Sequence, residues 1–335
     1  MATPHTSVTK PSILVLFCGG TIVQKPLASG GYGDVAPEQA IDILLNLNPR
    51  LNQSYNITIE YIDNIDSAAM SPNHWETMAQ TIYKYYDDYD GFVITHGTHT
   101  MAYTASALSF ALQNLGKPVV LTGAPIPSSE LSTEGAQNYS QAIALAAQNI
   151  AGVVIVFGEY TLLGTRSTKS SDTKKNAFIA TGNQKNYALS DFPSRHEGTL
   201  QIKPNFCSEV EVITLTPGLK ADRLQALIQQ DIRGLIIRGY GPGAIDYCYL
   251  PVLEQYQSLK IPVVMLTQCR EGVVDMTRYD NSLQALETGV IEGFDLSLEA
   301  ATTKLMWTLQ NYPYEQIKAI MQQNLVGEIN SANHV

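Results

Sequence analysis

Short runs of β-branched and other apolar residues alternate with amphipathic helical stretches along the chain, and this alternation limits its possible folds more than any other feature. Such a pattern is typical of an α/β fold with a mainly parallel sheet. The candidate strands of the first half are Ile13–Phe17, Ile57–Ile62, Gly91–Thr95, Val119–Leu121 and Val153–Phe157. The sequence therefore predicts a large α/β domain that begins at the first of these strands.

Apolar residues recur at helical spacing in the segments between these strands. One helix is expected to begin after Ser71, a second to run through Met101–Asn114, and a third through Gln137–Asn149. Gly116 and Pro118 follow the second helix and form an ordinary stop signal.

Strand and helix signals weaken between about Asn176 and Cys207, where glycines and prolines interrupt a polar segment. We therefore predict an N-terminal α/β domain over residues 1–185, a linker over 186–208, and a smaller C-terminal α/β domain over 209–335. The second domain is expected to contain strands Val210–Leu215, Gly234–Ile237 and Val263–Leu266, helices Ala221–Gln230 and Tyr249–Leu259, and two terminal helices.

The charge balance narrows the classes of partner. With 21 basic and 31 acidic residues the formal charge is −10 and the pI is near 5.0. An acidic chain without a basic cluster repels phosphate backbones, so nucleic-acid binding is not expected. The apolar runs are far shorter than the roughly 20 residues of a membrane-spanning helix, so no membrane partner is expected either.

Cysteine usage and the first residues both favour the cytoplasm. The four cysteines, Cys18, Cys207, Cys248 and Cys269, show no C-x-x-C spacing and are expected to be reduced thiols. The stretch from Met1 to Lys10 has neither an apolar core nor a small-residue cleavage site, unlike a secretory signal.

The first candidate for chemistry is the loop Cys18–Ile22, which leaves the first strand through Gly19 and Gly20. Two glycines let backbone amides approach a ligand and expose the following hydroxyl, so Thr21 is a candidate nucleophile. The alternative is a simple tight turn. Further along, Gly30–Gly33 lies in a stretch without regular periodicity, which suits either a mobile lid or a plain surface loop.

The second candidate is the loop His96–Thr100 at the carboxyl end of strand Gly91–Thr95, directly before a helix. Ligands of open α/β sheets bind at such ends, and helix N-termini attract anions, so a substrate carboxylate could bind here. The H-x-x-H spacing of His96 and His99 also permits a metal site, but no third ligand follows at a suitable spacing. We therefore expect no metal.

The third candidate is Lys169, in the run Arg166-Ser167-Thr168-Lys169. Burial lowers the pKa of a lysine, so an amine near a threonine hydroxyl can act as a base. A solvated surface lysine is the alternative. The glycine-rich loop Gly239–Gly243 lacks G-x-G-x-x-G spacing, so no nucleotide cofactor is expected.

The order of these motifs is informative: Gly-Gly-Thr-Ile, then His-Gly-Thr-x-Thr-Met-Ala-Tyr-Thr, then Leu-Thr-Gly, then Arg-Ser-Thr-Lys, then Leu-Thr-Gln-Cys. With these five motifs, the chain resembles the bacterial-type L-asparaginases, most closely their cytoplasmic type I branch, from about Ser12 to Glu328. The resemblance implies a two-domain α/β fold with a larger N-terminal flavodoxin-like sheet and a smaller C-terminal Rossmann-like domain. It also implies a homodimer or homotetramer, with active sites near the subunit interface and no cofactor.

The resemblance assigns roles residue by residue. Thr21 matches the nucleophile, Tyr32 matches the lid tyrosine that polarises it, and Ser67 falls where the substrate α-carboxylate binds. Thr98 and Lys169 match a second threonine–lysine pair that supplies the base. Gly20 and Gly97 would lie against the substrate. The implied reaction is hydrolysis of the side-chain amide of asparagine, or of a similar small-molecule amide, to the acid and ammonia.

Three positions depart from the family pattern. His99 replaces the aspartate that holds the substrate α-ammonium group, Ala244 stands where an asparagine is usual, and Ala68 follows Ser67 where a polar side chain is common. An imidazole cannot replace a carboxylate toward an ammonium group, and the lost charge-assisted hydrogen bond is worth roughly 1.5–3 kcal/mol. We therefore expect altered recognition of the α-amino position.

Three hypotheses about function remain open from the sequence. The first is an asparaginase-type amidohydrolase, because the groups that perform bond chemistry are all present. The second is a catalytically impaired homologue that binds a small acid or regulates, because fold does not fix function. The third is a metal hydrolase that uses His96 and His99.

Overall fold

The computed structural model describes residues 9–127, 134–182 and 186–330. Its larger sheet has the strand order β4-β1-β5-β7-β8-β9, and every pair is parallel except the last. The first five strands follow the flavodoxin-like order 2-1-3-4-5. Their bounds agree closely with the five predicted strands: β1 is Ser12–Phe17, β4 Asn56–Tyr61, β5 Gly91–Thr95, β7 Pro118–Thr122 and β8 Gly152–Phe157. The antiparallel edge strand, β9 (Tyr160–Leu163), was not predicted.

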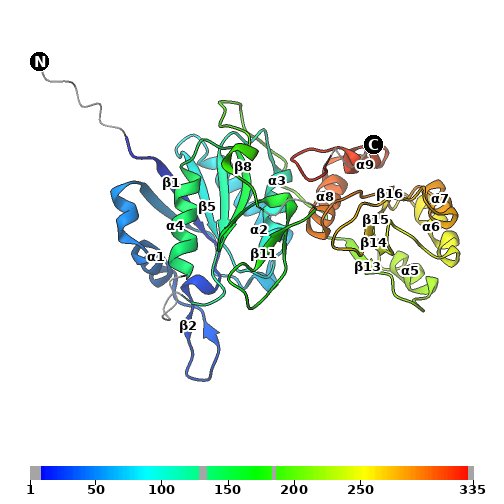
Figure 1. Ribbon diagram of the computed structural model, residues 1–335, viewed down its shortest axis with the longest axis horizontal. Coiled ribbons are helices and arrows are strands. Elements are labelled where there is room, and N and C mark those ends of the chain that lie inside the picture. The colour runs from blue at the N-terminus through cyan, green and yellow to red at the C-terminus, as the bar shows by residue number, and fades with distance from the viewer. Residues whose placement is uncertain (1–8, 128–133, 183–185, 331–335) are drawn as a thin grey trace, which may run out of the picture.

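Both faces of this sheet are buried, as a parallel sheet requires. Side chains of successive strand residues alternate between faces, so Leu14 and Leu16 join one core while Ile13, Val15 and Phe17 join the other. Helices α2 (Pro72–Lys84) and α3 (Met101–Ala111) cover the first core, and α1 (Pro37–Asn46) and α4 (Glu134–Ala146) cover the second (Figure 1).

Two predicted helix ends are wrong, and one of them is that of α4, which ends at Ala146 rather than at Asn149. Helix α3 ends at Ala111 rather than at Asn114, because the next two residues form a short strand, β6 (Leu112–Gln113). This strand pairs antiparallel with β12 (Gln201–Ile202), a partner that lies far along the chain. Asn114 then takes a φ of 58° and turns the chain toward β7.

The second sheet contains four parallel strands in the order β13-β14-β15-β16, as a Rossmann-like domain would. They are β13 (Val210–Thr214), β14 (Gly234–Gly239), β15 (Val263–Thr267) and β16 (Ile291–Glu292). Helices α5 (Ala221–Ile228), α6 (Leu250–Ser258) and α7 (Asp280–Glu287) cover one face, and α8 (Leu298–Asn311) and α9 (Tyr314–Gln322) cover the other. Three helices therefore follow β15, where two were expected.

The predicted linker, residues 186–208, runs along the N-terminal domain. Phe192 is buried in one of its cores and Leu200 in the other. The segment then reaches the second sheet, where Cys207 is buried beneath α8. The exact domain boundaries stay a prediction.

The two domains meet along helices α3 and α8, which lie side by side at the centre of the molecule (Figure 1). The rings of Phe110 and Trp307 stack there with centroids 6.0 Å apart. Within the described ranges, no helix is long and apolar enough to cross a membrane.

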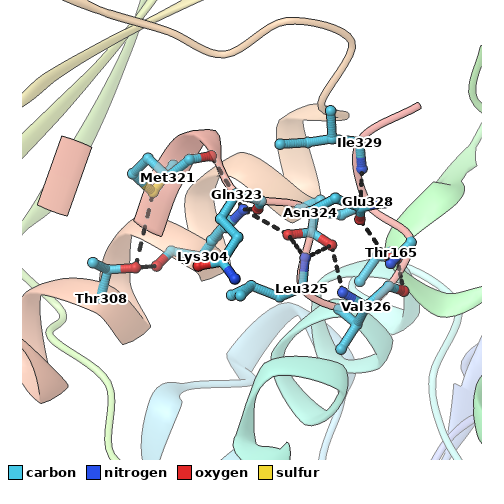
Figure 2. A network of polar contacts seen from close by, with 12 residues as sticks. Thr165, Lys304, Thr308, Met321, Gln323, Asn324, Leu325, Val326, Glu328 and Ile329 are labelled. Carbon is cyan, nitrogen blue, oxygen red and sulfur yellow. Dashed lines mark hydrogen bonds and ion pairs between the residues drawn. The ribbon is translucent and has the colours of Figure 1, made fainter. Parts of the chain in front are cut away.

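Helix α8 also anchors the C-terminal segment through a buried lysine. The Lys304 ammonium group donates to the carbonyls of Met321 (3.1 Å) and Gln323 (2.5 Å), and it pairs with the Glu328 carboxylate at 2.5 Å (Figure 2). Both side chains of the ion pair are fully buried. The carboxylate of Glu328 accepts further bonds from the backbone amides of Leu325 and Val326.

Lys304→Met should destabilise the folded chain strongly. Methionine fills a similar volume but leaves the Glu328 carboxylate buried without a counter-charge, and breaking one partner of such a pair costs about 3–5 kcal/mol. Urea denaturation followed by circular dichroism should show the loss. Lys260→Met, which breaks the exposed Lys260–Glu315 pair, is the matched control and should move the midpoint little. Equal midpoints for the two variants would contradict the prediction.

Candidate active site

The candidate site lies at the carboxyl ends of β1, β4 and β5 in the N-terminal sheet. In the strand order 2-1-3-4-5 the direction of winding reverses between β1 and β5, and ligands of doubly wound sheets bind at such a switch point. The loop with Thr21 follows β1, the loop with Ser67 follows β4, and the loop His96–Thr100 follows β5. The topology thus brings three predicted loops to one edge.

Gly20 allows the first of these loops to contact the third. Its φ is 101°, a conformation that side chains rarely adopt. A Cβ at this position would lie 2.8 Å from the carbonyl carbon of His96 and 2.9 Å from the amide nitrogen of Gly97. Thr21 follows at once, half-buried, as the first residue of a short 3₁₀ helix, Thr21–Val23, whose other residues are buried.

Gly97 contacts the second loop in the same manner. A Cβ there would lie 2.5 Å from Ser67 Oγ. Ser67 is 1% exposed, its hydroxyl oxygen accepts from the amide of His99 at 3.1 Å, and its carbonyl accepts from the Thr100 hydroxyl at 2.7 Å. Ser67 therefore fixes the backbone of the loop that carries Thr98.

Lys169 reaches this loop from outside the main sheet. It ends strand β10 (Ser167–Lys169), which pairs with β11 (Phe178–Ala180). Its ammonium group donates to Thr98 Oγ1 at 2.9 Å. Burial lowers the pKa of Lys169 below its ordinary value, and Asp172 opposes the shift. A half-buried lysine with a lowered pKa, bonded to a hydroxyl, is suited to accept a proton.

His96 is part of the core. Its imidazole is fully buried, Nδ1 lies 2.6 Å from the carbonyl oxygen of Gly97, and Nε2 lies 2.8 Å from Thr104 Oγ1. A carbonyl only accepts, so Nδ1 carries the proton, and Nε2 accepts from the Thr104 hydroxyl. That hydroxyl in turn accepts from Trp75 Nε1 at 3.0 Å. Burial lowers the pKa of His96 to about 4.

His99 lies apart from His96 and faces solvent. Its side chain is 64% exposed, and Nδ1 lies 3.7 Å from a carboxylate oxygen of Asp66. The H-x-x-H pair therefore does not point at one position. Among the described residues, no cluster of three or more histidine, cysteine, aspartate or glutamate side chains could hold a metal ion.

Asp66 lies beside the candidate site, and the sequence motifs did not single it out. Its carboxylate accepts from the amide of Ala68 at 2.9 Å and so begins the short 3₁₀ helix Ser67–Ala69. The sequence did offer one signal, because Asp66 directly precedes the predicted ligand-binding Ser67. An aspartate side chain often accepts a hydrogen bond from the backbone amide two residues further along the chain. Asp66 places a negative charge beside His99.

Tyr32 lies on a short hairpin, a regular element that the sequence periodicity did not indicate. Strands β2 (Lys25–Pro26) and β3 (Tyr32–Gly33) pair across a turn in which Gly30 and Gly31 have φ values of 88° and 79°. The hairpin extends from the edge of the domain (Figure 1), and Tyr32 is 41% exposed. Tyr32 thus belongs to a different element from the three loops at the sheet edge.

The fold and these loops match the family models of one class of enzyme. The model described as "Asparaginase, N-terminal" matches residues 12–193, and the model described as "Glutaminase/Asparaginase C-terminal domain" matches residues 209–321. The chain therefore belongs to the asparaginase family and is an asparaginase-like amidohydrolase. The resemblance found in the sequence motifs is confirmed, as is the two-domain fold that it implied.

Relatives match the chain over nearly its whole length. L-asparaginase 1 of Escherichia coli is 38% identical over 96% of this chain and 98% of its own length. The solved L-asparaginases of Thermococcus kodakarensis and Vibrio cholerae superimpose with TM-scores of 0.86, at 36% and 34% identity, each covering 96% of this chain and at least 99% of its own. The similarity therefore extends across both domains.

The His96 imidazole should stay neutral, with the proton on Nδ1, down to about pH 4. The unfolded chain takes up this proton near pH 6.5, so the folded state binds fewer protons between these values. The contribution of His96 to stability is therefore present above pH 6.5 and is lost as the pH falls through about 4.

Nitrogen-15 NMR of histidine-labelled protein measures both the tautomer and the titration of His96. The resonances are assigned by their absence from a His96→Asn variant. A proton on Nε2 at neutral pH, or titration near pH 6.5, would contradict the assignment of His96 to the core.

Proposed function

We propose that this protein hydrolyses the side-chain amide of asparagine, or of a closely similar amide, to the acid and ammonia, with Thr21 as nucleophile. The observation that carries the proposal is the 2.9 Å hydrogen bond from Lys169 to Thr98. It lies beside the loop of Thr21, because Gly20 packs on the His96–Gly97 peptide. A hydroxyl nucleophile and a lysine-bonded hydroxyl at one sheet edge suit acyl transfer.

In the first step the Thr21 hydroxyl attacks the amide carbonyl carbon. The hydroxyl loses its proton, the C–N bond breaks, and ammonia leaves with that proton, so an ester joins the substrate to Thr21. Tyr32 would polarise the Thr21 hydroxyl when the β2–β3 hairpin closes over the substrate. An exposed tyrosine on a two-stranded hairpin suits such a lid.

In the second step water attacks the ester and releases the acid and Thr21. The base is the Thr98–Lys169 pair, in which the amine takes the proton through the Thr98 hydroxyl or directly from water. The lowered pKa of Lys169 favours this role, because a larger fraction of the amine is neutral at a given pH. These steps use side chains of the protein alone and need no metal or organic cofactor.

Recognition of the substrate is assigned to the loop after β4 and to His99. Ser67 would bind the α-carboxylate, and the backbone of Gly20 and Gly97 would lie against the substrate. His99 stands at the position for the α-amino group, where an imidazole offers a donor rather than a carboxylate. The pocket would therefore favour a substrate whose α-amino group is acylated, peptide-linked or absent over free asparagine.

The assembly and location are proposed on separate grounds. A homodimer or homotetramer would complete each site with the loop of Ala244 from a second copy. That loop is a tight turn at the end of β14, in which Ala244 and Tyr240 form a bridge. Free thiols at all four cysteines, two buried and two exposed, suit the reducing cytoplasm.

Thr21→Ala should abolish amide hydrolysis while the protein stays folded. The nucleophile supplies the covalent route, so its removal should lower kcat by about 10³-fold or more. Ammonia release from asparagine and from N-acetyl-asparagine measures the effect. Thr77→Ala, which removes an exposed hydroxyl on α2, is the matched control. Turnover by Thr21→Ala at the rate of the control would exclude Thr21 as nucleophile.

His99→Asp should improve hydrolysis of free asparagine. A carboxylate restores a charge-assisted hydrogen bond to the α-ammonium group, which corresponds to a gain of about 10- to 100-fold in kcat/KM. The same change should weaken an N-acylated substrate, so kcat/KM is measured on both asparagine and N-acetyl-asparagine. High activity of the native protein on free asparagine, unimproved by the substitution, would contradict the proposed change of recognition.

A further inference from the structure

Thr168, the residue before Lys169, is held by the other domain. Its hydroxyl donates to a carboxylate oxygen of Glu299 at 2.6 Å, across 131 residues of sequence. Glu299 lies in the first turn of α8 and is 8% exposed. Successive side chains of a strand point to opposite sides, so Thr168 faces α8 while Lys169 faces Thr98.

Arg166, two residues before Thr168, also binds this segment to the C-terminal domain. Its guanidinium group is buried, and it pairs with the Asp295 carboxylate at 2.9 Å. It also donates to the carbonyls of Asp295 (3.1 Å) and Glu328 (2.9 Å). Glu328 is itself held by Lys304 of α8 (Figure 2). The C-terminal domain therefore binds the segment before Lys169 at two alternate residues, Arg166 and Thr168.

Helix α8 supports the other half of the catalytic pair as well. Thr98 lies three residues before the start of α3, and α3 packs along α8 through Phe110 and Trp307. The hydroxyl of Ser106 on α3 donates to the carbonyl of Gly164, which begins the Lys169 segment. Helix α8 therefore supports the segments of both partners in the hydrogen bond between Lys169 and Thr98.

We propose that Glu299 is a positioning residue for amide hydrolysis. Through the Thr168 hydroxyl it fixes strand β10, and so keeps the Lys169 ammonium group at hydrogen-bonding distance from Thr98. This inference rests on the proposed function, because it concerns the geometry of the same threonine–lysine pair.

Glu299 acts through geometry rather than through its charge. Burial and Asp172 account for the pKa of Lys169, and Glu299 is not among the causes. Burial raises the pKa of Glu299 itself, while hydrogen bonds from Thr168 and Ser297 oppose the rise. A carboxyl oxygen accepts the Thr168 hydrogen bond in either protonation state, so a glutamine at this position keeps the contact.

The surroundings allow this hydrogen bond to be removed without unfolding the chain. Thr168 and Glu299 line a cavity of about 710 Å³ between the domains, together with polar groups of Arg238 and Gln268. Water in such a cavity can satisfy either group when the other is replaced. Loss of the contact should therefore appear in catalysis before it appears in stability.

Four variants test the role: Thr168→Val and Glu299→Leu remove the contact, whereas Thr168→Ser and Glu299→Gln keep it. The first two should lower kcat by about 10- to 100-fold, because small misplacements of a catalytic group have effects of this size. Their KM should change by no more than about twofold, since Ser67 and His99 are untouched. The two conservative variants should stay within about threefold of the native kcat.

Two further variants show whether an unexpected result contradicts the positioning role of Glu299 or the role of Lys169 itself. Thr302→Val removes a hydroxyl on α8 that donates to a carbonyl of the same helix, and it should leave kcat unchanged. Lys169→Met should be nearly inactive. Native kcat in Thr168→Val, with an inactive Lys169→Met, would overturn the positioning role and leave the proposed function intact. Native kcat in Lys169→Met would remove Lys169 from the mechanism and so overturn the positioning role as well, whereas no amide hydrolysis by the native protein would overturn the proposed function itself. Equal losses in Glu299→Gln and Glu299→Leu would also overturn the positioning role.

Discussion

The site depends on backbone contacts that glycine alone permits. Gly20 and Gly97 each lie so close to a neighbouring loop that a Cβ would approach within 2.8 Å of a backbone or side-chain atom. Any larger residue would push the loops after β1, β4 and β5 apart by more than the margin of a hydrogen bond. The parallel sheet aligns the three loops, and the glycines let them pack against one another.

The C-terminal domain holds the segment that carries Lys169 in place against the N-terminal domain. Its contribution within the chain is a buried polar network around Arg166, Asp295, Lys304 and Glu328, in which each charge has a partner. Desolvation makes such networks poor sources of net stability, because the cost of burying the charges offsets much of their attraction. They do impose one geometry, since any displaced charge is left unpaired. We therefore interpret the network as fixing where the Lys169 segment lies.

The sequence predicted the features that short-range patterns determine. Periodicity located the predicted sheet strands to within about one residue at most ends. Strand-end motifs made Thr21 and the loop of Thr98 candidates, whereas Ser67 came only from the family resemblance. The end of α3 was misplaced because β6 pairs with residues about 90 positions away, and the β2–β3 hairpin was missed because its strands contain two residues each. Glu299 could not be found by any local pattern, since its partner is 131 residues distant.

The proposed chemistry and the proposed recognition use different side chains of the loop His96–Thr100. The backbone amide of His99 is fixed by Ser67, whereas its imidazole points to solvent beside Asp66. The neighbouring Thr98 side chain points the other way, to Lys169. A substitution at position 99 should therefore change the charge at this surface without moving the Thr98 hydroxyl. The proposed change of recognition at His99 is therefore compatible with the hydrogen bond between Lys169 and Thr98.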